Sequence, residues 1–109
     1  MSTVSSQATT ITASASETTI VTADPNNGNG LVELVITSTI AVANTFTLRD
    51  ATGGTTRAIF DYPAGAAVAT VPFVVKFNPP LMQTKNSNWT IQATSATAAS
   101  HILAVFAPQ

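Results

Sequence analysis

Residues 71–90 read VPFVVKFNPPLMQTKNSNWT and contain the strongest fold signal of the chain. Large apolar side chains alternate along the first half of this stretch, with the period of two that marks a β-strand with one buried face. Pro72 cannot donate a ladder hydrogen bond, which predicts a position at a sheet edge or at a bulge. Pro79 and Pro80 offer no N–H either, so we expect the strand to end there.

The same period of two recurs on both sides of this stretch, in LVELVITSTI (residues 31–40), NTFTLRD (44–50) and WTIQATS (89–95). Turn-forming residues separate the runs, as in DPNNGNG (24–30), and helical periodicity never persists. The pattern predicts an all-β fold, an antiparallel, jelly-roll-like β-sandwich of about seven or eight strands. The predicted core consists of Val32, Leu34, Ile36, Phe46, Leu48, Val71, Phe73, Val75, Phe77, Trp89 and Ile91.

Composition narrows the possible functions. The 109 residues suit one domain, with 45% hydrophobic and only 8% charged residues, a net charge of −1 and no cysteine. No basic cluster is available to bind nucleic acid, and no thiolate is available for a disulfide, a metal or catalysis. Neither a secretory signal nor a membrane span is apparent. We expect residues 1–10 to form a flexible or exchanged N-terminal arm and residues 11–109 to form the sandwich.

The candidates for chemistry are weak. His101, the one histidine of the chain, stands at the start of an apolar strand, where packing or solvation explains it better than catalysis. Asp24 opens an oxygen-rich stretch that lacks the glycine and the glutamate of a calcium loop. The stretch DATGG (50–54) is explained as a hairpin loop, and the glycosylation sequon at Asn88 as coincidence. We therefore expect no enzymatic activity, no metal and no cofactor.

Self-association is the more informative expectation. A surface with so few charges suits contact with neighbouring subunits better than a free monomer. The last strand, HILAVFA (101–107), is apolar on both faces, so its second face calls for cover besides the core. An extended arm of about ten residues spans roughly 30 Å and could pair with the sheet edge of a neighbour. The candidate assembly surface consists of Val4, Ile11, Leu103 and Val105.

With the strands placed, the chain resembles the small β-sandwich virion proteins of tailed bacteriophages, of the head decoration or fibre-base type. The similarity extends over about residues 8–107 and includes TLRDATGG (47–54) and FNPPL (77–81). The resemblance implies a capsid decoration or cement protein in the virion, made in the host cytoplasm. It also implies a homotrimer whose partners are its own copies and the major capsid or other virion proteins. The alternative is a module that binds a host glycan or receptor, which an exposed Trp89 in a groove would favour.

Overall fold

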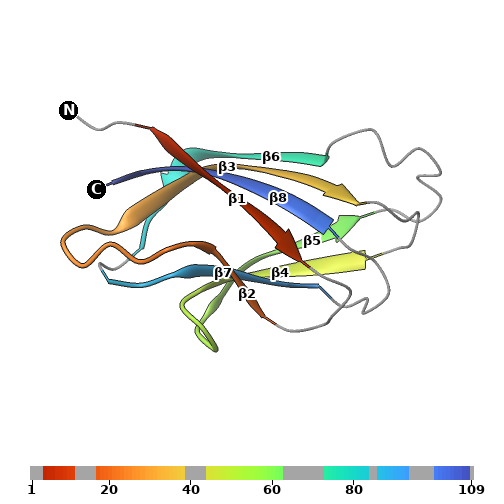
Figure 1. Ribbon diagram of the computed structural model, residues 1–109, viewed down its shortest axis with the longest axis horizontal. Coiled ribbons are helices and arrows are strands. Elements are labelled where there is room, and N and C mark those ends of the chain that lie inside the picture. Colours follow the sequence, from red (N-terminus) through yellow and green to blue (C-terminus); the bar gives the residue numbers. More distant parts are fainter. Residues whose placement is uncertain are drawn as a thin grey trace.

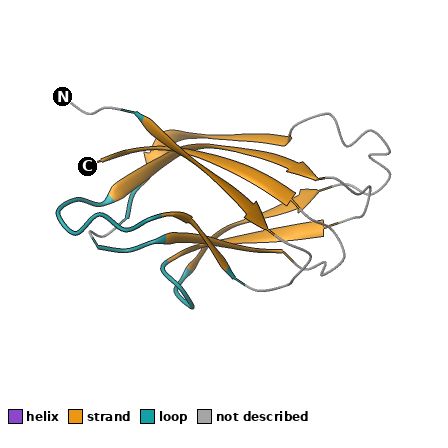
Figure 2. Cartoon of the chain, in the orientation of Figure 1, coloured by secondary structure: helices purple, strands orange, loops and turns teal. Residues whose placement is uncertain are grey.

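The computed structural model describes residues 4–11, 17–38, 44–62, 73–83, 86–93 and 100–108. These residues form strands and loops without a helix (Figure 2), and hence no helical segment among them that could cross a bilayer. The strands are β1 (Ser5–Ile11), β2 (Thr18–Val21), β3 (Asn29–Ser38), β4 (Asn44–Asp50), β5 (Thr56–Tyr62), β6 (Phe73–Leu81), β7 (Trp89–Ala93) and β8 (Ser100–Pro108).

The eight strands form two layers, one sheet in the order β1-β8-β3-β6 and the other in the order β2-β7-β4-β5 (Figure 1). The pairs β1–β8, β2–β7, β3–β6 and β4–β5 are all antiparallel, so the chain doubles back on itself as one long ribbon. Rolling that ribbon brings β3 beside β8 and β4 beside β7. This connectivity is the jelly roll. The predicted antiparallel β-sandwich is therefore confirmed.

The core lies between the two sheets, and its largest buried side chain is Trp89. Most of the predicted core is found there: Leu34, Ile36, Phe46, Leu48, Trp89 and Ile91 are fully buried. Phe73, Val75 and Phe77 are only partly buried and pack against the core from the edge strand β6. Val71, also predicted for the core, and Pro72 lie outside the described residues.

Two local predictions were wrong. Val32 is only half-buried, and Leu31 takes the core position instead, because the pairing of β3 shifts register between Leu31 and Glu33. Strand β6 also does not stop at Pro79 and Pro80 but continues to Leu81. An edge strand tolerates proline, and the irregular pairing here removes the need for regular ladder hydrogen bonds.

The N-terminal segment is part of the sandwich. Ser5–Ile11 forms β1 and pairs with β8 of the same chain over its whole length, so the structure has a sheet strand where we expected an arm. Residues 1–3 lie outside the described part of the chain. The side chain of Gln7 ties β1 to the other sheet, because its Oε1 accepts a hydrogen bond of 3.0 Å from the Thr22 N–H.

Candidate assembly face

The strand register decides which side chains share the outer face of the sheet β1-β8-β3-β6. Ala8 pairs with Leu103, Leu103 with Val35, and Val35 with Val74. Residues opposite each other in an antiparallel ladder lie on the same face. Four apolar residues from four neighbouring strands therefore form one row across the sheet, and we call Ala8, Leu103, Val35 and Val74 the apolar row.

The apolar row is open to solvent. Leu103 is 38% exposed and Val74 48% exposed, which is high for side chains of this size. Ala8 is exposed as well, and Val35 is half-buried between its neighbours. Their sequence neighbours point inward, since Leu34, Ile36, Ile102 and Ala104 are all buried. The alternation along each strand thus gives this sheet an apolar inner face and an apolar row on its outer face.

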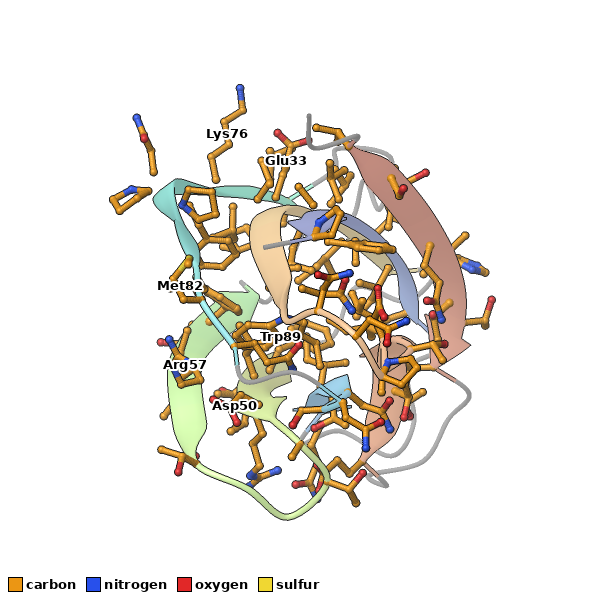
Figure 3. All side chains as sticks on the ribbon, turned by 90° about the vertical axis from the view of Figure 1, so that its left-hand side faces the viewer. Glu33, Asp50, Arg57, Lys76, Met82 and Trp89 are labelled. Atoms are coloured by element: carbon orange, nitrogen blue, oxygen red, sulfur yellow. The ribbon has the colours of Figure 1, made fainter. Side chains whose placement is uncertain are left out.

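Polar rows flank the apolar row on both sides. On one side Thr10 pairs with His101, and His101 with Thr37. Thr10 Oγ1 and His101 Nδ1 are hydrogen bonded at 3.1 Å, beside a shallow hollow of about 220 Å³. On the other side, Glu33 and Lys76 face each other at 4.0 Å, and both are visible at the top of Figure 3. An apolar centre with a polar margin is the usual composition of a protein–protein interface.

The outer face of the second sheet is different. Thr45 donates a hydrogen bond of 3.0 Å to Asp61, and Arg49 donates one of 2.6 Å to Gln92. Thr47 lies between these pairs, beside Ile59, which is the large exposed apolar residue of this face among the described residues. Because hydroxyls, amides and charges cover this face, the sheet β1-β8-β3-β6 carries the better candidate for assembly.

The four predicted assembly residues lie in three different places in the structure. Leu103 and Val105 lie on the outer face as predicted, with Val105 half-buried between Ser6 and Glu33. Val4 lies just before β1 and is 61% exposed. Ile11 is wrong as a surface residue, because at 2% exposure it belongs to the core.

The outer-face residues that the sequence analysis missed are Ala8, Val35 and Val74. Each lies on the outward side of its own strand by simple alternation, but a single outward alanine or valine does not indicate an interface. The register aligns the three residues with Leu103, and this register joins strands that are far apart in the sequence.

Trp89 is fully buried and lies near the middle of the view in Figure 3, and polar groups contact its ring. Its Nε1 donates a hydrogen bond of 2.7 Å to the Asn29 carbonyl, and the Arg57 guanidinium lies 5.4 Å from the ring centroid. Arg57 also donates to Asp50 and to the Met82 carbonyl, at 2.8 Å each. A buried ring offers no stacking surface for a sugar, so the feature that would favour glycan binding is not found at Trp89.

The loops at residues 24–30 and 50–54 each form hydrogen bonds within their own turn. The Asp24 carboxylate accepts hydrogen bonds from the Asn26 N–H at 2.8 Å and from the Asn27 side chain at 3.4 Å, and both lower the pKa of Asp24. In the β4–β5 loop, the Gly54 N–H donates to Ala51 O at 2.9 Å, and Gly53 adopts a positive φ of 68°. Among the described residues, no group of three or more His, Asp or Glu side chains is arranged to hold a metal ion.

A hydrogen-bonded cluster around Glu17 joins three segments of the second sheet. The Glu17 carboxylate accepts hydrogen bonds from the Thr90 hydroxyl and from the Gly53 N–H, and Arg49 lies 3.7 Å away. These contacts, led by the Thr90 hydrogen bond, hold the pKa of Glu17 below its ordinary value against the opposing effect of partial burial. The carboxylate form of Glu17 therefore stabilises the fold.

Replacing Glu17 with glutamine is expected to cost about 1–2 kcal/mol of stability at pH 7, because a charged acceptor is lost. The folded pKa lies below the unfolded one, so this contribution is present above the ordinary value of 4.5 and is lost as pH falls through the folded pKa. Urea unfolding at pH 7 and pH 3 measures it. Glu17→Gln should lose less stability between the two pH values than the wild type. Equal pH dependence for Glu17→Gln and wild type would contradict this role.

Comparison with known proteins finds similarity in structure and not in sequence. No protein-family model matches the chain, and no curated protein matches its sequence. A chain from the acidic stable capsid structure of Helicobacter pylori bacteriophage KHP30 is similar, with a TM-score of 0.67 at 11% identity over 98% of this chain and 93% of that one. The mitogen derived from Yersinia pseudotuberculosis aligns with a TM-score of 0.49 at 17% identity, over 96% of this chain and 86% of that one. The first similarity shows a shared fold.

Proposed function

We propose that this protein is a non-enzymatic structural component of a bacteriophage particle, a capsid decoration or cement protein of a tailed phage. It attaches to the particle through the outer face of the sheet β1-β8-β3-β6, and it also associates with its own copies. The observation that carries the proposal is the apolar row, which crosses all four strands of that sheet.

The apolar row supports an interface because burying it against a partner is favourable. Removing apolar surface from water contributes about 25 cal/mol per Å², and contiguous exposed apolar surface commonly marks an interaction site. Charge repulsion would oppose association only weakly, since only 8% of the residues are charged. The shared fold with a chain of a phage capsid structure supports the same proposal.

The first test is the composition of purified particles. Quantitative mass spectrometry should find the protein at a fixed high copy number relative to the major capsid protein. Recombinant protein should rebind to particles that lack it. Raising the salt to about 1 M should leave that binding nearly intact, because apolar contacts are not screened. Absence of the protein from the particles would overturn the proposal.

Leu103→Asp is the matched test of the face. An unpaired carboxylate at the centre of the apolar row would be desolvated on binding, at a cost of several kcal/mol, so affinity for particles should fall by about 100-fold or more. Ile59→Asp is the control, because Ile59 is 62% exposed but lies on the second sheet. It should bind like the wild type. Both variants should keep the wild-type urea midpoint, and a Leu103→Asp variant that still binds fully would exclude this face.

A further inference from the structure

We infer that the free edge of β1, the side that does not face β8, pairs with β1 of a second copy of this chain. The two strands run antiparallel about a two-fold axis at Ala8, and two sheets of four strands become one of eight. This inference rests on the proposed function, because it names the contact through which the copies associate.

The edges of the two sheets are formed by β1, β6, β2 and β5. Proteins protect edges with short strands, charges or proline, because an open edge offers unpaired N–H and C=O groups to another chain. Strand β2 has only four residues. Strand β6 carries Lys76, Pro79 and Pro80. Strand β5 carries Arg57 and Asp61. Each of these three edges has a protective feature.

Strand β1 has none of these features. It reads SSQATTI, seven residues without a charge or a proline, and β8 is its partner on one side only among the described strands. On the opposite side of the sandwich, the edge strands β5 and β6 also pack against each other. The Phe60 ring of β5 lies 6.5 Å from the Phe73 ring and 6.2 Å from the Phe77 ring of β6. Of the four described edges, β1 is the one suited to pairing.

A second copy of β1 fits this edge because the strand is self-complementary. With the axis at Ala8, Ser6 of one copy lies opposite Thr10 of the other, and the two Ala8 side chains face each other. All three residues are exposed on the outer side of β1. Hydroxyl pairs across strands are favourable, small side chains fit at the axis, and no like charges meet.

The apolar row favours this register over its neighbours. A two-fold axis perpendicular to the sheet keeps both outer faces on the same side. At Ala8, the row of one copy then continues directly into the row of the other, from Val74 to Val74 across eight strands. The combined row would span roughly 34 Å at the usual strand spacing. An axis at Ser6 or at Thr10 would offset the two rows and break this continuity.

Cysteine cross-linking tests the pairing directly, because the chain has no cysteine of its own. Opposite Cβ atoms in antiparallel strands lie about 4.5–5.5 Å apart, within reach of a disulfide or a short bis-maleimide. Ala8→Cys should cross-link to a dimer at micromolar concentration. Ser6→Cys and Thr10→Cys should cross-link when mixed and much less when separate. Ile59→Cys on the β5 edge is the control and should remain uncross-linked. Failure of Ala8→Cys to cross-link would overturn the register.

Sedimentation provides the second test. The β1 contact predicts that the wild type is a dimer rather than the trimer that the resemblance implies. Ala8→Lys places two positive charges opposite each other and should weaken dimerisation by about tenfold or more. Ile59→Lys, with the same change in charge, should remain dimeric, and both variants should keep the wild-type urea midpoint. A wild type that is monomeric or trimeric at high concentration, or a dimer unaffected by Ala8→Lys, would exclude the β1 contact. Particles that still contain the protein in that case would leave the proposed function standing, so the two failures are distinguishable.

Discussion

Trp89→Ala is expected to cost about 3–5 kcal/mol, a large share of the roughly 5–15 kcal/mol that stabilises a typical domain. Trp89 is the largest fully buried side chain, so its removal leaves a large cavity between the sheets. It also leaves the Asn29 carbonyl without its indole donor. Urea unfolding followed by circular dichroism measures the loss. Fluorescence is unsuitable, because Trp89 is the sole tryptophan of the chain.

Two variants separate the causes of that loss. Trp89→Phe keeps an aromatic ring but lacks the indole N–H, so it should cost less, about 1–3 kcal/mol. Phe73→Ala removes a large ring at the partly buried margin of the core and should also cost less than Trp89→Ala. If Phe73→Ala were as destabilising as Trp89→Ala, the core would be centred nearer β6 than the structure places it.

Leu31→Ala should cost about 2–5 kcal/mol, whereas Val32→Ala should cost less than about 1.5 kcal/mol. Leu31 is fully buried and Val32 only half-buried, because β3 changes register at this point. Simple alternation from Leu34 and Ile36 predicts the reverse order. Urea midpoints of the two single variants, measured together, decide between them. A larger loss for Val32→Ala would show that β3 has no shift in solution.

The sequence was sufficient where each strand obeys its own alternation. Phe46 and Leu48 in β4, and Trp89 and Ile91 in β7, were predicted as core and are fully buried. The sequence was insufficient where a register shift between paired strands changes which residues face the core, as at Val32. Strand pairing joins distant segments, so the sequence of one strand does not show where its register with a partner will shift. The prediction that β6 ends at Pro79 and Pro80 was wrong because β6 is an edge strand. Proline ends a central strand but is tolerated in an edge strand, and the position of a strand in its sheet is again set by distant segments.

The candidate face was predictable in part. The apolar second side of β8 predicted the outward positions of Leu103 and Val105 from the sequence, whereas their role in assembly stays a prediction. Ile11 was misassigned, since the polar sequence around it gives no sign of which side of β1 faces the core. Ala8, Val35 and Val74 became recognisable only once the register had aligned them with Leu103.

The ribbon that builds the jelly roll also constrains how the protein is made. Every strand pair among the described strands joins a member of β1–β4 to a member of β5–β8. The first half of the chain therefore leaves the ribosome without one native partner strand. Of the described strands, β8 emerges after the other seven and then lies between β1 and β3. Such long-range pairing folds slowly and leaves strands open to aggregation meanwhile. The sheet β1-β8-β3-β6 is consequently completed only once β8 has emerged and inserts between β1 and β3.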